Sequence, residues 1–217
     1  MAKFFGKSGL FAYSAVVVIA ANMQVLKLVQ YSSMNEPIAL GTVLFSTVFV
    51  VDNILTEYYG VETARKCVAV SFFSYLFFSL VMKITIWHPE VDCKKCINLH
   101  RELKNVFSPC FVFFISSLAS YAVSQLTDIL VFSTLKKLMK SKCLSFRSFI
   151  SMAISTFVDN FVFSVLAWIV FSKHPISLFL VLKTYVFTAY MIRLIIAALC
   201  VPLVRLSGTV ISGKLHV

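Results

Sequence analysis

Residues 38–60 of this chain read IALGTVLFSTVFVVDNILTEYYG, an apolar segment that ends in a short polar run. The apolar part is long enough to cross the hydrocarbon core of a bilayer, which takes about 20 helical residues. Asp52 lies inside it, and a carboxylate facing lipid costs roughly 2.5–3.5 kcal/mol on insertion scales. We therefore expect Asp52 to face a protein interior or a wet cavity, where it is a candidate functional residue.

The composition of the whole chain indicates an integral membrane protein. Of the 217 residues, 59% are hydrophobic and 22 are phenylalanine, whereas soluble domains are about 45–50% apolar. Windows of about 20 apolar residues predict six transmembrane helices, at approximately residues 10–30, 38–56, 67–87, 107–135, 149–171 and 178–204. Because only short loops remain between them, the sequence predicts an all-α membrane protein with a single polytopic domain over residues 1–217.

The distribution of basic residues predicts the orientation of the chain. The formal net charge is +11, which by itself could indicate nucleic-acid binding. With the N-terminus inside, however, eleven of the 20 Lys and Arg residues fall on the cytoplasmic side and five on the opposite side. This pattern predicts that both termini are cytoplasmic. We expect the basic run from Lys136 to Arg147 to touch anionic lipid headgroups, so the predicted partner is the bilayer and not nucleic acid.

A short internal repeat relates the second and fifth predicted helices. Residues 46–53 read STVFVVDN and residues 155–160 read STFVDN. Each segment lies in the middle helix of a three-helix half, and two halves with an odd number of helices have inverted orientations. Two inverted three-helix halves are therefore one architecture that the sequence allows, although so short a match can also arise by chance.

Polar residues recur at helical spacing in the later spans. Tyr121, Gln125 and Asp128 share one face of the fourth span. The fifth span carries a similar stripe of Ser148, Ser151, Ser155 and Asp159. Serines commonly join helices in bilayers, but this explains the carboxylates poorly. We expect a shared polar interior, in which Arg193 of the sixth span pairs with an aspartate either as part of a binding site or as a purely structural ion pair.

The loop before the fourth span contains Cys93 and Cys96, flanked by His88 and His100. These residue types can bind zinc, although the spacing fits no common zinc site closely. Because the loop is predicted to face the oxidising side, the cysteines could instead form a local disulfide or stay as free thiols. The sequence leaves these alternatives open, and it predicts no cofactor.

Four motifs, in order, resemble the queuosine precursor transporters, also called the vitamin uptake transporter family. They run from Asp52 through Thr56-Glu57-Tyr58-Tyr59-Gly60 to Arg65, from Ser120-Tyr121 through Gln125 and Asp128 to Phe132, from Ser155 through Asp159 to Phe163, and from Arg193 to Pro202. The resemblance covers about residues 10–206. The chain departs from the family in two places, since Arg193 stands where the family carries lysine and the cysteine loop is not a family feature.

The resemblance implies a multi-pass carrier in the bacterial inner membrane that imports 7-deazaguanine precursors of the tRNA nucleoside queuosine. Such precursors include 7-cyano-7-deazaguanine, its aminomethyl relative and queuine. The implied partner is therefore a small heterocycle, and a homo-oligomer is compatible with the sequence. The departures leave the choice of substrate open. The sequence also leaves open whether import is coupled to protons or proceeds by facilitated diffusion.

The chemistry of the polar residues fits such a cargo. A carboxylate such as that of Asp128 or Asp159 can accept both the ring N–H and the exocyclic amine of a guanine-like base. Amides of Gln125, Asn53 and Asn160 suit its carbonyl edge, and Tyr121, Tyr58 and Phe163 offer faces for stacking. The predicted substrate-binding residues are Asp52, Asn53, Glu57, Tyr121, Gln125, Asp128, Asp159, Asn160 and Arg193, with Glu57 and Arg65 shaping the cytoplasmic mouth.

Two other classes are compatible with a small apolar chain. Substrate-binding subunits of energy-coupling-factor vitamin importers also have six helices, but they dock through an Ala-x3-Ala pair in the first helix, and residues 10–30 contain none. An intramembrane enzyme is disfavoured because the four histidines lie outside the predicted spans and no H-E-x-x-H or G-x-S-x-G motif occurs. The sequence therefore predicts a transporter and not an enzyme, and it predicts no metal site.

Overall fold

The computed structural model describes residues 2–24, 27–29, 38–107, 111–140, 142–171, 177–178 and 187–215. Seven α-helices occur among them: α1 (Ala2–Gln24), α2 (Gly41–Tyr58), α3 (Val61–Trp87), α4 (Lys94–Phe107), α5 (Phe111–Leu138), α6 (Leu144–Val165) and α8 (Phe187–Leu215). A short π-helical segment, η1 (Leu166–Val170), continues α6. Two strands of two residues each, β1 (Leu28–Val29) and β2 (Ile38–Ala39), pair antiparallel between α1 and α2.

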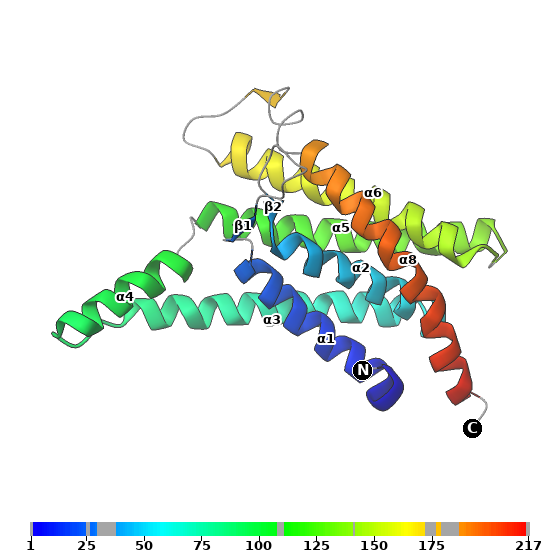
Figure 1. Ribbon diagram of the computed structural model, residues 1–217, viewed down its shortest axis with the longest axis horizontal. Coiled ribbons are helices and arrows are strands. Elements are labelled where there is room, and N and C mark those ends of the chain that lie inside the picture. The colour runs from blue at the N-terminus through cyan, green and yellow to red at the C-terminus, as the bar shows by residue number, and fades with distance from the viewer. Residues whose placement is uncertain are drawn as a thin grey trace.

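The long helices alternate in direction along the chain. Figure 1 shows α1, α2, α3, α5, α6 and α8 running back and forth through one bundle, and α1 begins at the end of the bundle where α8 finishes. The connections from α2 to α3 and from α5 to α6 lie at this same end, whereas α4 lies at the opposite end. The segments that the sequence assigns to the cytoplasmic side therefore gather at one end, which we call the basic end.

In the described part of the chain, five helices are long and apolar enough to cross a membrane: Phe5–Gln24, Val61–Trp87, Phe114–Leu138, Leu144–Val170 and Tyr190–Gly208. The prediction of an α-helical membrane protein is therefore confirmed. Of the predicted last span, residues 179–186, including Lys183, lie outside the described part. Pro202 lies within α8.

Helix α2, which corresponds to the second predicted span, is the most enclosed helix of the bundle. It is 18 residues long, and its buried residues include Asp52, Asn53 and Thr56. Helices α1, α3, α5, α6 and α8 all pack against it. Polar side chains can therefore occupy α2 without meeting lipid.

Helix α4 was not predicted. The sequence analysis assigned this region to a loop and began the fourth span at Phe107, but α4 ends at Phe107 and α5 begins at Phe111. No residue of α4 is buried, and its contact with the bundle includes the ring of Phe107 against that of Phe78, at 6.2 Å between centroids. Cys93 and Cys96 form a disulfide at its start, which decides between the alternatives that the sequence left open.

Candidate functional site

The carboxylate of Asp128 is the best-defined group in the polar interior. It is fully buried on α5. Ser151 and Ser155 of α6 both contact its Oδ1 through their hydroxyls, the latter at 3.2 Å, and the single Ser151 proton is shared between this oxygen and the Asp128 backbone carbonyl at 2.9 Å. Its Oδ2 has no hydrogen-bond partner among the described residues. The two serines thus fix the orientation of the carboxylate and leave one oxygen able to accept a ligand.

Asp159 of α6 is held by an ion pair. Arg193 of α8 donates to its Oδ2, as the sequence predicted for an aspartate, and Ser124 of α5 donates to its Oδ1 at 3.3 Å. The guanidinium of Arg193 also lies 5.6 Å from the centre of the Phe45 ring. These contacts tie α5, α6 and α8 together, and they neutralise Asp159 where an isolated charge would be costly.

Asp52 is buried on α2, and its surroundings differ from those of Asp128 and Asp159. Among the described residues, neither of its carboxylate oxygens has a hydrogen-bond partner, and the same is true of both amide atoms of the adjacent Asn53. Helix α5 packs against α2, and Asp128 of α5 contributes to the electrostatic environment of Asp52. A buried polar group without a partner costs about 1–3 kcal/mol, so such a concentration of these groups is typical of a site that binds a polar ligand or water.

The remaining predicted site residues lie on the same helices. Gln125, one turn before Asp128, is fully buried, and neither of its amide atoms has a partner among the described residues. Tyr121 is also buried, and its ring packs edge-on against Phe45, at 5.9 Å between centroids. Asn160 follows Asp159, and its buried Nδ2 likewise has no partner in the described part of the chain. We call these buried aspartates and amides of α2, α5 and α6, together with Arg193 of α8, the polar core.

Glu57 lies outside this polar core, at the basic end. Arg147 of α6 donates to both of its carboxylate oxygens at 3.2 Å, and Lys136 of α5 lies 3.1 Å from Oε2 and donates to the Glu57 carbonyl at 2.8 Å. Arg147 is completely buried, with its guanidinium 5.1 Å from the centre of the Phe132 ring. We call these three charged residues the Glu57 cluster.

The Glu57 cluster corrects the prediction that the whole basic run from Lys136 to Arg147 touches lipid headgroups, because its first and last members bind a carboxylate inside the bundle. Arg65 was predicted to shape the mouth with Glu57, but it pairs with Glu62 one turn earlier on the exposed surface of α3. Glu57 pairs with Lys136 and Arg147, which adjoin it, whereas Arg65 has a carboxylate closer by on its own helix.

Arg147 could have been recognised from its spacing. Residues 147, 151, 155 and 159 follow one another at intervals of four, so Arg147 continues the polar stripe of the fifth span toward the basic end. The stripe predicted for the fifth span starts at Ser148, and Arg147 is placed there with the loop lysines.

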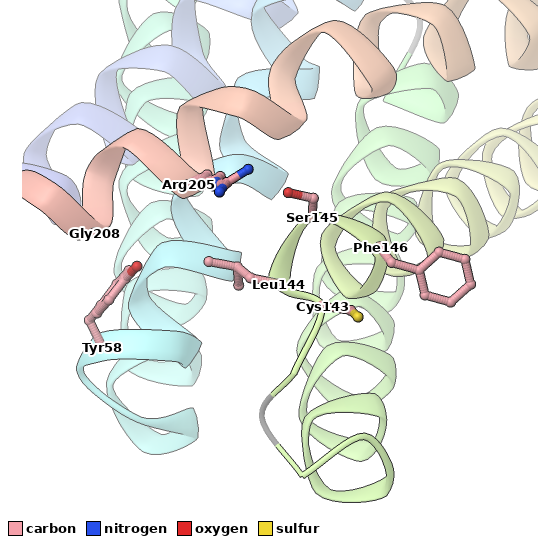
Figure 2. A pocket seen from close by; sticks show the side chains of 7 residues that line it. All are labelled: Tyr58, Cys143, Leu144, Ser145, Phe146, Arg205 and Gly208. Atoms are coloured by element: carbon pink, nitrogen blue, oxygen red, sulfur yellow. The ribbon is translucent and has the colours of Figure 1, made fainter.

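Two pockets open at the basic end. One, of about 330 Å³, is lined by Thr56, Gly60, Val61, Ser133, Lys136 and Lys137. The other, of about 720 Å³, is lined by Tyr58, Cys143, Leu144, Ser145, Phe146, Arg205 and Gly208. Figure 2 shows Arg205 and Ser145 pointing toward one another, while Phe146 points away. Tyr58, predicted to stack on a bound base, thus lies at the mouth of the bundle.

These features define a multi-pass helical membrane protein with a polar core enclosed by apolar helices and with pockets at one end. Residues 39–207 match the model of the family described as "Putative vitamin uptake transporter", and the chain belongs to that family. It is therefore a transporter, and not an enzyme, as the sequence predicted.

The chain is also similar to two curated proteins. A "Probable queuosine precursor transporter" of Bacillus subtilis (strain 168) is 29% identical over 186 residues, which cover 84% of this chain and 78% of the relative. A protein of the same description from Haemophilus influenzae (strain ATCC 51907 / DSM 11121 / KW20 / Rd) is 31% identical over 130 residues, which cover 59% of this chain and 51% of the relative. No solved structure matches the chain.

Proposed function

We propose that this protein imports queuosine precursors, 7-deazaguanine bases, across a bacterial inner membrane. The descriptions of both relatives support this cargo. The observation that carries the proposal is the pairing of Asp128, with one oxygen fixed by two serines and one without a partner, with the unpartnered amide of Gln125 one turn away. A guanine-like edge offers donors to the carboxylate and an acceptor to the amide.

In the proposed site, Asp128 Oδ2 accepts hydrogen bonds from the ring N–H and exocyclic amine of the base. Gln125, Asn53 and Asn160 serve its carbonyl edge, and Tyr121 offers the flat face. Asp52 adds negative charge beside Asp128. Asp159 and Arg193 shape the far wall, where their ion pair fixes α6 against α8.

Six membrane-crossing helices in two inverted halves are part of the proposal. Helix α2 is the additional span, sheltered from lipid by its neighbours. Helices α2 and α6, which carry the repeated Val-Asp-Asn sequence at residues 51–53 and 158–160, run in opposite directions through the bundle (Figure 1). This arrangement agrees with an inverted repeat whose middle helices meet at a central site.

In the proposed cycle, the Glu57 cluster closes the cytoplasmic end of the path. It joins α2, α5 and α6 between the polar core and the basic end, and Thr56, which lines the smaller pocket, is one turn from Asp52. Opening this end requires Glu57 to separate from Arg147 and Lys136. Both termini are cytoplasmic in this orientation, because the basic segments lie at the same end.

The test is the queuosine content of tRNA in a bacterium that lacks both precursor synthesis and its own importer. The host expresses this chain and is fed each precursor separately at low concentration. We expect one or more precursors to restore queuosine, and we expect Asp128→Asn to abolish the restoration. The matched control is Asp92→Asn, the same substitution at an exposed loop position, which should restore queuosine as the unsubstituted chain does.

Failure of every precursor, with the protein confirmed in the membrane, would overturn the proposed cargo. The same host also addresses the energy-coupling-factor alternative. If its coupling ATPase genes are deleted and uptake persists, the chain works without those subunits. Loss of uptake together with co-purification of the ATPases would identify it as a substrate-binding subunit instead.

A further inference from the structure

The charges inside the bundle do not balance. In the described part of the chain, four carboxylates lie inside the bundle and three cations face them. Arg147 and Lys136 both bind Glu57, and Arg193 binds Asp159. No ion pair is formed by Asp52 or Asp128 within the described residues, although both are buried.

The groups that surround these two carboxylates are neutral or acidic. Tyr121 and Asp128 of α5 and Cys67 of α3 lie within electrostatic range of Asp52. From α6, Ser151 and Ser155 bind Asp128. Among the described residues of the other elements packed against α2, α1 contributes the hydroxyls of Tyr13 and Ser14, and Arg193 of α8 already binds Asp159.

A second observation indicates that a ligand belongs between them. Gln125, fully buried one turn from Asp128, has an amide oxygen without a partner, as does Asn53, the neighbour of Asp52. Thr56, one turn beyond Asp52, has a buried hydroxyl that likewise has no hydrogen-bond partner among the described residues. Two carboxylates with surplus amide and hydroxyl oxygens form a donor set for a hard cation, which prefers oxygen ligands.

We propose that Asp52 and Asp128 together bind one monovalent cation, a proton or a sodium ion, which is carried inward with the substrate. This inference rests on the proposed function, because it supplies the driving force for the same import. Two buried carboxylates without a cation repel each other and pay the full cost of desolvation, so a bound cation stabilises the occupied state. Cation binding therefore favours the form of the site that holds the neutral base.

The first test measures cation binding without transport. The purified protein is melted in detergent, first over a range from neutral to mildly acidic pH without sodium, and then at fixed pH with sodium chloride replacing choline chloride. A ligand that binds only the folded state should raise Tm by about 3–6 °C for each tenfold rise in its concentration above its Kd. A response to acid identifies the proton, and a response to sodium at fixed pH identifies sodium.

The variant Asp52→Asn should lose this response, and Asp128→Asn should lose it as well. The matched control is Asp92→Asn, the same substitution at an exposed loop position, which should keep the response. A wild-type Tm that responds to neither cation would overturn the inference. So would a response that persists unchanged in both Asp52→Asn and Asp128→Asn.

The second test separates this inference from the proposed function and needs only the wild-type protein. In proteoliposomes, counterflow of labelled precursor against internal unlabelled precursor requires no gradient and reports the proposed function alone. An inward gradient of the cation found in the first test should then drive accumulation above equilibrium, which a protonophore or sodium ionophore abolishes. Counterflow without driven accumulation would overturn the cation site, whereas absent counterflow would overturn the proposed function.

Discussion

Arg147 and Glu57 are 90 residues apart in the chain, yet the guanidinium of one donates to both carboxylate oxygens of the other at 3.2 Å. Arg147 is fully buried and also donates to the Lys142 carbonyl at 3.0 Å, so the pair fixes the beginning of α6 against the end of α2. Lys136 adds a second cation from α5. A charged contact therefore joins three helices at the basic end.

Reversing the charges of this pair tests its strength. Glu57→Arg and Arg147→Glu should each lower Tm sharply, because breaking a buried ion pair costs about 3–5 kcal/mol. The double variant should recover part of the loss, with a coupling free energy of about 0.5–3 kcal/mol between the two positions. Thermal unfolding of the four proteins in detergent gives this value.

The control is the exposed pair of Glu62 and Arg65. The equivalent reversals there should change stability by less than about 1 kcal/mol, as is typical of surface ion pairs. Equal effects at the buried and exposed pairs would contradict the role given to Arg147.

The ion pair of Arg193 with Asp159 should be essential for import. Asp159→Ala or Arg193→Ala leaves the other charge buried and alone, so we expect uptake to be lost while the protein stays in the membrane. Arg193→Lys keeps the positive charge but loses the fixed geometry of the guanidinium, and it should retain part of the uptake. Queuosine in tRNA, normalised to membrane protein, measures the outcome, and normal import by the two alanine variants would refute this role.

Ser151 and Ser155 are expected to position Asp128. Removing one donor to a charged acceptor costs about 1.5–3 kcal/mol, so Ser151→Ala should weaken substrate binding by about 10- to 100-fold with a smaller effect on the maximal uptake rate. Competition by unlabelled precursor measures the affinity. Thr85→Val is the control, because this exposed hydroxyl of α3 donates to the Val81 carbonyl of its own helix; an equal loss of affinity there would argue against a positioning role.

The orientation of the chain can be checked with thiol labelling. Cys143 is exposed at the basic end, and Cys93 and Cys96 form their disulfide beside α4 at the other end. In intact cells, a membrane-impermeant maleimide should label a single-cysteine variant that retains Cys96 and should miss one that retains Cys143. Permeabilising the inner membrane should expose Cys143, and the reverse pattern would place the termini outside.

Gly208 allows α8 to approach the end of α2. A β-carbon at this position would lie 2.5 Å from the hydroxyl oxygen of Tyr58, and the next nearest atom of that ring is 3.4 Å away. Gly208→Ala should therefore lower stability by about 1–3 kcal/mol, the usual cost of overpacking. Tyr58→Phe removes the clashing oxygen and should restore most of Tm in the double variant. An unchanged Tm for Gly208→Ala alone would show that the helices separate easily at this point.

The sequence anticipated the long helices well because lipid imposes a simple rule on them. A segment that crosses a bilayer must satisfy its backbone hydrogen bonds internally and present apolar side chains. This rule does not apply to helix α4, because α4 is exposed and amphipathic. It therefore lacks the continuous hydrophobicity by which the sequence predicts the other helices. The polar core was foreseen through Asp52, Asp128 and Asp159 for the same reason, because charges in such segments must turn inward.

What the sequence by itself determined is therefore an α-helical membrane protein with buried carboxylates, together with its family. Only the tertiary structure decided which cation forms an ion pair with which carboxylate. Arg147 and Lys136 could equally have faced headgroups, and Arg193 could have bound Asp128 instead of Asp159. Pairing depends on which helices adjoin, and electrostatic attraction in a desolvated interior acts over a few ångströms between residues 34 or 90 positions apart. In the described part of the chain, this pairing forms no ion pair to Asp52 or Asp128.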